Sequence, residues 1–141
     1  MITVSLETAK KLKAAGFLQT TEFSHVKHLD NDSEYYKLEW GNNYADDMYI
    51  SAPTTDEILA DLSDELAEDI DVMILKYDGF FAVGYYNHNA DFEDHLGNEI
   101  DEDDFRRWEI RFTNNSLREA LAELWLWAKE NNYINKGTET K

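Results

Sequence analysis

The chain has 141 residues, with 30 acidic against 13 basic side chains and a formal net charge of −17. It contains no cysteine, which excludes disulfides, zinc–thiolate sites and cysteine nucleophiles. The strongly negative charge argues against adhesion to anionic lipid, and we expect no direct nucleic-acid binding. Hydrophobic residues make up 43% and aromatic residues 13% of the chain, so the composition predicts a folded acidic protein rather than an acidic linker.

The N-terminal third of the sequence predicts one helix followed by a β-hairpin. Ser5 is placed to cap the helix, and Gly16 is placed to end it. Residues 23–29 and 35–40 have the composition of strands, with a cluster of turn residues between them. A further short strand is expected around residues 48–51.

A second helix is predicted after the only proline, because Thr54 and Glu57 have the spacing of a capping box. Apolar residues continue at helical spacing as far as Leu66, so we expect the helix to extend that far. On this prediction its opposite side shows four acids to water: Asp61, Asp64, Glu65 and Glu68.

The second half of the chain begins with a strongly predicted hairpin. Residues 72–77 and 80–86 are rich in β-branched and aromatic side chains, and the Asp78-Gly79 pair between them is typical of a type I′ turn. Residues 106–112 alternate in the same way and are expected to pair with 80–86. The acidic segment 88–104 then becomes the loop that connects these two strands.

The last predicted element is a helix that starts after Ser116. Glu119 lies three residues further on, as a capping-box partner should. Apolar side chains line one face of this helix from Leu117 to Ala128, and Trp127 lies off the centre of that stripe. An exposed Trp127 would indicate a contact with a partner, whereas a buried one would be a wall of the core.

Together these elements predict the α+β class, as a four- to five-stranded, mostly antiparallel sheet with about three helices packed on it. The sequence shows no repeat and no linker, so we expect residues 1–134 to form a single domain and 135–141 to be a frayed C-terminal tail. The sequence leaves open whether the first hairpin joins the same sheet as the second.

The net charge is concentrated in the middle of the chain. Residues 38–105 contain 20 acids and one base, whereas the two flanks together hold 10 acids and 12 bases. Such a block is either a solvated face that keeps the protein soluble or an electrostatic surface for a basic partner protein. On the second interpretation, the candidate partner-binding residues are Asp61, Glu65, Glu68, Glu93, Asp94, Asp101, Glu102, Asp103, Asp104 and Trp127.

Residues that catalyse reactions or bind metals do not form a recognisable pattern in this sequence. The acidic segment 91–104 fails the calcium-binding EF-hand template, because Gly97 and His95 occupy the wrong positions. His25 and His28 lie three apart in a predicted strand, so they point to opposite faces and cannot share a metal ion. No phosphate-binding loop or nucleophile motif occurs. We therefore expect no catalytic residues, no cofactor and no metal site.

Three stretches of the chain form a recognisable pattern: LETAKKLKAAGF at 6–17, APTTDEIL at 52–59 and LREALAELWLWAKE at 117–130. In this order they resemble a group of small uncharacterised proteins from bacteriophages and prophages. The Leu-Trp-Leu-Trp sequence of the third is the most specific part, and the acidic segment 88–104 is not part of the pattern. The resemblance implies an origin in a mobile element and a bacterial cytoplasm, and it assigns no catalytic or binding residues.

We therefore expect a non-enzymatic accessory or interaction protein of phage or prophage origin. No secretory signal and no apolar span of about 20 residues is visible, so we expect a cytoplasmic location in the bacterial host and no membrane contact. The expected partner is a protein, and both a monomer and a homodimer remain open.

Two alternative functions remain. The first is an acidic DNA mimic that inhibits a host DNA-binding or DNA-cleaving protein. It requires the acids of the second helix and of segment 91–104 to form one continuous face. The second alternative is a structural or oligomeric component of a virion, and exposure of Trp127 or of Tyr85 and Tyr86 would support it.

Overall fold

The structure is a computed structural model that describes residues 3–30, 33–88, 96–97 and 107–134. The predicted tail at 135–141 lies outside the described residues. In chain order the elements are α1 (Leu6–Ala14), β1 (Phe23–Asp30), β2 (Ser33–Trp40), β3 (Tyr49–Ser51), α2 (Thr55–Asp61), β4 (Glu65–Ala67), β5 (Ile70–Tyr77), β6 (Phe80–Asn87), β7 (Trp108–Asn114) and α3 (Leu117–Glu130).

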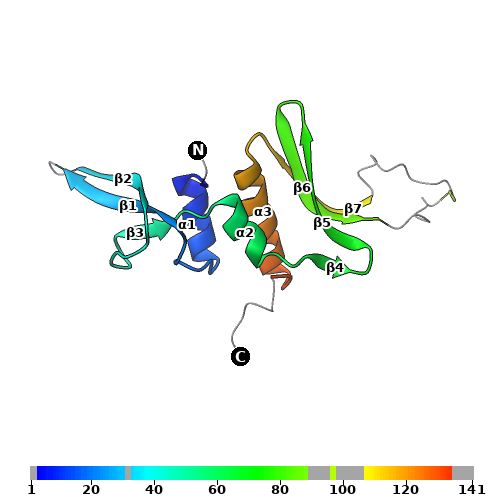
Figure 1. The fold of residues 1–141 in the computed structure, drawn as a ribbon, viewed down its shortest axis with the longest axis horizontal. Helices are drawn as coiled ribbons and strands as arrows, with labels where there is room; N and C mark the ends of the chain where they lie inside the picture. Colours follow the sequence, from blue (N-terminus) through cyan, green and yellow to red (C-terminus); the bar gives the residue numbers. More distant parts are fainter. Residues whose placement is uncertain (1–2, 31–32, 89–95, 98–106, 135–141) are drawn as a thin grey trace.

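Two antiparallel sheets lie at opposite ends of an elongated molecule, with the three helices between them (Figure 1). One sheet has the strand order β2-β1-β3 and the other has the order β4-β5-β6-β7. The predicted α+β class is therefore confirmed. The question that the sequence left open is also answered, because the first hairpin forms a sheet of its own.

The first sheet is built around a hairpin that pairs along its full length, from Phe23 opposite Trp40 to Asp30 opposite Ser33. The short strand β3 adds to the other side of β1. Helix α1 packs beside β3, and Tyr36 of β2 contacts the hydrophobic core on the same side. The ammonium group of Lys10 lies 5.4 Å from the centre of the Tyr36 ring, which joins α1 to β2.

The second sheet contains the predicted hairpin β5–β6, with Asp78-Gly79 as its turn. A type I′ turn needs positive φ at both residues, but only Gly79 has it, at 88°, so the predicted turn type is wrong. The predicted pairing of β6 with β7 is confirmed. Its register shifts beside Tyr85 and Tyr86, where Glu109 is the extra residue of a β-bulge.

Helix α2 is shorter than the sequence predicts, because it ends at Asp61 and not at Leu66. Leu62 stays buried at 2% exposure, but its backbone turns to an extended conformation with ψ of 142°. Residues 65–67 then form β4 and pair with β5. The apolar spacing is satisfied by burial without a helix, because strand pairing outweighs the weak local preference for one.

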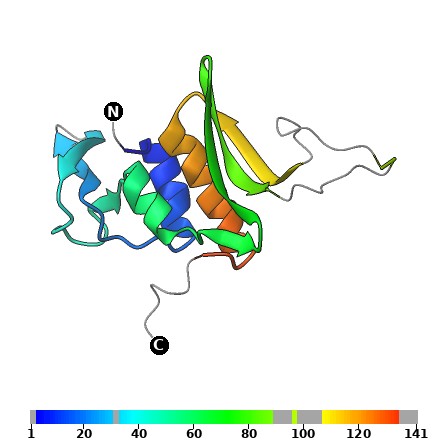
Figure 2. The same cartoon turned by 45° about the vertical axis from the view of Figure 1, so that its right-hand side comes forward.

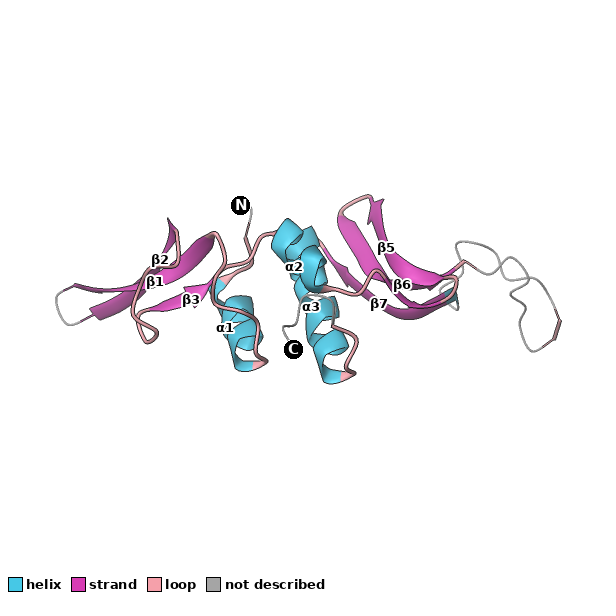
Figure 3. Ribbon diagram, turned by 60° about the horizontal axis from the view of Figure 1, so that its bottom comes forward, coloured by secondary structure: helices cyan, strands magenta, loops and turns pink. Residues whose placement is uncertain are grey.

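Helix α3 is the centre of the hydrophobic core. It packs against α1 and α2 on one side and against β6 and β7 on the other (Figures 2 and 3). Phe17, which follows α1, places its ring 5.0 Å from the ring of Trp125. The predicted apolar stripe is confirmed, and it is broad enough to serve two layers. The fully buried residues of the helix are Ala120, Leu121, Ala122, Leu124, Trp125 and Ala128.

Side chains cap all three helices, but not all in the way the sequence predicts. Thr54 and Glu57 form the predicted reciprocal capping box of α2. Ser116 caps α3, but the carboxylate of Glu119 does not return to Ser116. It reaches across to α1, where it accepts hydrogen bonds from the Ser5 N–H, at 2.8 Å, and from the Thr8 hydroxyl. The predicted second capping box is therefore wrong, because its acid caps a different helix.

The bulge between β6 and β7 predicts that Gly84 cannot be replaced. A Cβ atom at this position would lie 1.9 Å from the carbonyl oxygen of Ile110. We expect Gly84→Ala to lower the free energy of unfolding by at least about 3 kcal/mol in urea titrations, because the backbone of β7 must move. Ala82→Gly, in the same strand, serves as the control and should cost about 1 kcal/mol. Equal losses in the two variants would contradict the close approach.

The bridge from α3 to α1 predicts a specific role for Glu119. We expect Glu119→Gln to lower the free energy of unfolding by about 1–2 kcal/mol, because only one atom of the amide can accept a hydrogen bond. Glu130→Gln, an exposed position at the end of the same helix, is the matched control and should change stability little. Thermal melts of the two variants would show the difference, and identical melting temperatures would rule out the bridge.

Candidate functional site

The predicted partner-binding surface does not come together on one element. Of the four described members, Asp61 ends α2, Glu65 lies in β4, Glu68 follows β4 and Trp127 lies on α3. The expectation that the acids of residues 61–68 share one helical face is therefore wrong, because the helix stops at the first of them. The other candidates lie outside the described residues: Glu93, Asp94, Asp101, Glu102, Asp103 and Asp104.

Two acidic side chains of α2 accept hydrogen bonds from other parts of the protein. Asp61 accepts a hydrogen bond from the indole N–H of buried Trp125 at 3.3 Å. Glu57 accepts backbone N–H bonds from both Thr54 and Glu22, each at 2.9 Å. These carboxylates satisfy donors at the edge of the core, so they contribute to stability and add little to a free anionic surface.

The indole of Trp127 lies at the edge of the hydrophobic core, packed against it. It is half-buried, stacks on Tyr133 with 5.5 Å between ring centres, and lies tilted against Tyr85 at 6.3 Å. Because both neighbours are themselves aromatic, these contacts account for an off-centre tryptophan in the helix.

Three of the eight large apolar side chains that are exposed among the described residues lie on the β1–β2 arm, which we define as the strands 23–30 and 33–40. Leu29 is 71%, Tyr35 48% and Trp40 73% exposed. The arm extends away from the helices in Figure 1. The sequence does not distinguish these residues, because alternation predicts the two faces of a hairpin and not which part of a face is covered.

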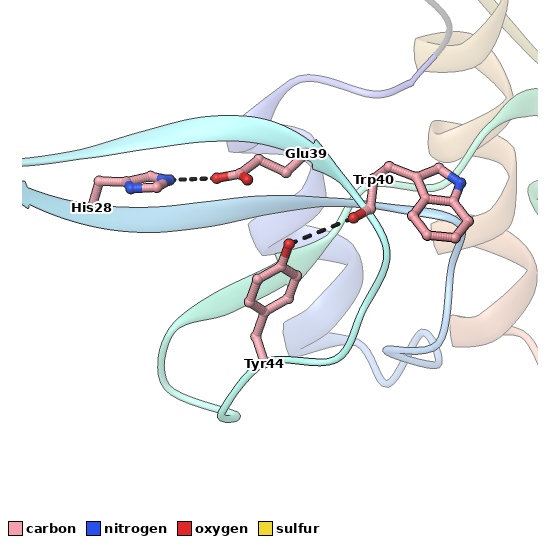
Figure 4. A network of polar contacts seen from close by, with 4 residues as sticks. All are labelled: His28, Glu39, Trp40 and Tyr44. Atoms are coloured by element: carbon pink, nitrogen blue, oxygen red, sulfur yellow. Dashed lines mark hydrogen bonds and ion pairs between the residues drawn. The ribbon is translucent and has the colours of Figure 1, made fainter.

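Polar contacts order the side chains of the arm (Figure 4). Nε2 of His28 lies 2.5 Å from a carboxylate oxygen of Glu39, and the His28 ring stacks on Tyr35 with 5.4 Å between ring centres. Beyond the end of β2, the hydroxyl of Tyr44 donates to the carbonyl oxygen of Trp40 at 3.5 Å. On the face of the arm that carries Tyr35, the exposed ring is thus held by the side chain of His28.

The backbone of β2 presents an edge that pairs with no strand of the described residues. The N–H of Gly41 donates to the carbonyl oxygen of Glu22, which makes this pair a hydrogen-bonded one. Such pairs alternate along an antiparallel ladder, so the odd-numbered residues of β2 direct their backbone groups toward β1. The even-numbered residues direct theirs away from it, and no strand of the described ranges lies on that side. These residues are Glu34, Tyr36, Leu38 and Trp40.

Two buried titratable groups serve the fold. His25 places Nε2 3.0 Å from the carbonyl oxygen of Val4, and burial lowers its pKa from the ordinary 6.5, against smaller opposing effects of that hydrogen bond and of Glu119. The hydroxyl of Tyr85 donates to the carbonyl oxygen of Ser63 at 2.7 Å, and burial raises its pKa to about 12, with the nearby charge of Asp64 adding to the shift.

The described surface offers little that resembles a reaction centre. A shallow groove of about 510 Å³ lies where the start of β1 meets the N-terminal ends of α2 and α3, and it carries both signs of charge, with Glu22, Asp56 and Arg118 among its lining residues. Within the described ranges, no group of three or more histidines and carboxylates is arranged to hold a metal ion. Across the same residues, no helix has the length and apolarity needed to cross a membrane.

No protein-family model, no curated protein and no solved structure matches the chain.

The environment of His25 predicts a pH dependence of stability. Because its pKa is lower in the folded than in the unfolded state, the unfolded chain binds this proton more tightly, and the native state loses stability as the pH falls below 6.5 toward the native pKa. We expect His25→Gln, which keeps a donor for Val4, to show a shallower loss of stability between about pH 7 and pH 5.5 in urea titrations. Parallel curves for the two proteins would contradict this assignment.

Proposed function

We propose that the protein is a non-enzymatic interaction protein of phage or prophage origin that acts by binding a protein through the β1–β2 arm. The observation that carries this proposal is the exposure of Leu29, Tyr35 and Trp40 on a single projecting hairpin. Tyrosine and tryptophan are enriched among the residues that dominate the energy of protein–protein contacts. An exposed sheet edge, such as that of β2, supplies main-chain hydrogen bonds for an added strand.

The order within the arm supports the same proposal. A side chain that is already held by its neighbours loses less conformational entropy when it enters an interface. The stacking of His28 on Tyr35 and the contact of His28 with Glu39 provide such support. The arm also stands clear of the helices in a second view, so a partner can approach β2 from the side (Figure 3).

The phage origin rests on the resemblance alone. Its three stretches correspond to α1 with its C-terminal end, to the start of α2, and to α3. The resemblance therefore covers the helices that lie between the two sheets. The arm is not part of the three stretches. A common scaffold with an arm particular to this chain is what we expect of a group of accessory proteins with different partners.

No contact among the described residues favours the DNA-mimic alternative. It needs one continuous acidic face, but the acids of residues 56–71 come from α2, the segment between α2 and β4, β4 itself, the turn after β4, and β5. Glu57 and Asp61 among them accept hydrogen bonds from within the protein. The oligomeric alternative does not receive the support expected from exposed Tyr85 and Tyr86, because these side chains are buried. The edge of β2 supports it instead.

Photo-crosslinking in bacterial cells tests the proposal. A photoreactive amino acid placed at position 35 or 40 should give covalent adducts with protein, either a second copy of this chain or another protein. The same amino acid at position 18 is the control, because Leu18 is 66% exposed but lies outside the arm. Equal or absent adducts at all three positions would refute the arm as the contact surface.

A further inference from the structure

We infer that the partner of the arm is a second copy of this chain, joined to the first through the edges of the two β2 strands. This inference rests on the proposed function, because it assigns an occupant to the same surface. The two sheets would continue into one sheet of six strands, with the order β3-β1-β2-β2-β1-β3. A closed pair with twofold symmetry is the commonest form of homo-oligomer.

The backbone of β2 suits an antiparallel pair with itself. A twofold axis normal to the sheet keeps each face of the sheet on the same side in both copies, so even-numbered residues lie opposite even-numbered residues. In β2 these residues are the ones whose N–H and C=O groups point away from β1. The donors and acceptors on this edge of one copy therefore meet those of the other. The carbonyl oxygen of Trp40, which accepts from the Tyr44 hydroxyl, has a second lone pair for the partner strand.

The side chains select the register. With the axis at Leu38, Lys37 of each copy lies opposite Glu39 of the other, and Tyr36 lies opposite Trp40. Lys37 and Glu39 lie on the sheet face opposite the one on which Tyr36 contacts the core. Opposite charges and aromatic pairs directly across from each other both stabilise antiparallel strands.

The neighbouring registers are less favourable. An axis at Lys37 places that residue opposite itself, and an axis at Glu39 does the same for that carboxylate. Like charges directly opposite each other destabilise a strand pair. The register centred on Leu38 is therefore favoured over both by charge complementarity.

The distribution of net charge permits two copies to approach each other at this end of the molecule. Residues 1–51, which contain α1 and the whole first sheet, carry eight acids and five bases, a net of −3, although the whole chain has a charge of −17. The arm also lies at the opposite end of the molecule from β5, β6 and β7 (Figure 1). Repulsion between two strongly acidic chains is therefore weakest where the edges of β2 would meet.

Charge reversal on the intact protein tests the register. We expect the wild type to form dimers in sedimentation velocity experiments at moderate ionic strength. Lys37→Glu and Glu39→Lys should each weaken self-association by on the order of tenfold or more, because each replaces two attractive pairs with two repulsive ones. An equimolar mixture of the two variants should recover dimers, since the introduced carboxylate of one chain then lies opposite the introduced amine of the other. Circular dichroism would verify that both variants are folded.

A pair of substitutions at Leu38 tests the backbone contact. The N–H of Leu38 points away from β1, so Leu38→Pro removes a donor that the hairpin itself does not use. We expect Leu38→Pro to abolish the dimer while the chain stays folded. Leu38→Ala truncates the same side chain but keeps the N–H, so it is the matched control and should still dimerise.

Different results would overturn the inference and the proposed function. A monomeric wild type whose arm crosslinks only to another protein overturns the second copy as occupant but leaves the arm as the contact surface. A dimer that is indifferent to Lys37→Glu, Glu39→Lys and Leu38→Pro also overturns the inference. A monomer without crosslinks from the arm overturns both.

Discussion

The burial of α3 between two layers is the interaction on which the rest of the structure depends. A helix that is apolar on most of its circumference is stable only when protein surrounds it. The alanines of α3 allow neighbouring elements to come close, and Trp125 fills the space toward Phe17. The second sheet packs on this helix directly, whereas the first sheet is connected to it through α1, whose N-terminus Glu119 holds.

In this arrangement the helices form the core, and the arm carries exposed side chains. The helices bury their side chains in a shared core, and each sheet extends from that core to one end of the molecule. The arm can therefore present Tyr35 and Trp40 to water without exposing the core itself. The carboxylates of this region also fall into two groups. Glu57 and Asp61 accept hydrogen bonds from within the protein, whereas Glu65 is exposed to solvent.

Local signals in the sequence predict local structure well here. Ser5 and Thr54 cap the helices that their spacing indicates, and the hairpin around Gly79 forms where it is predicted. The predictions fail where the outcome depends on a distant partner. Glu119 has the spacing to bond back to Ser116 but binds the N-terminus of α1 instead. The apolar residues up to Leu66 have helical spacing, but residues 65–67 form a strand that pairs with β5. The exposure of the arm could not be predicted either, because it depends on how far α1 extends across the sheet.

The position of α3 along the chain also governs how the protein is made. The helix spans residues 117–130 and is the last of the described elements, so all the others must leave the ribosome before the core can close. Until then α1 and the β5–β6 hairpin lack the apolar face of α3 on which both pack, and nascent chains in this state are exposed to aggregation. A premature stop shortly before residue 117 would therefore yield an unfolded polypeptide and not a shorter functional domain.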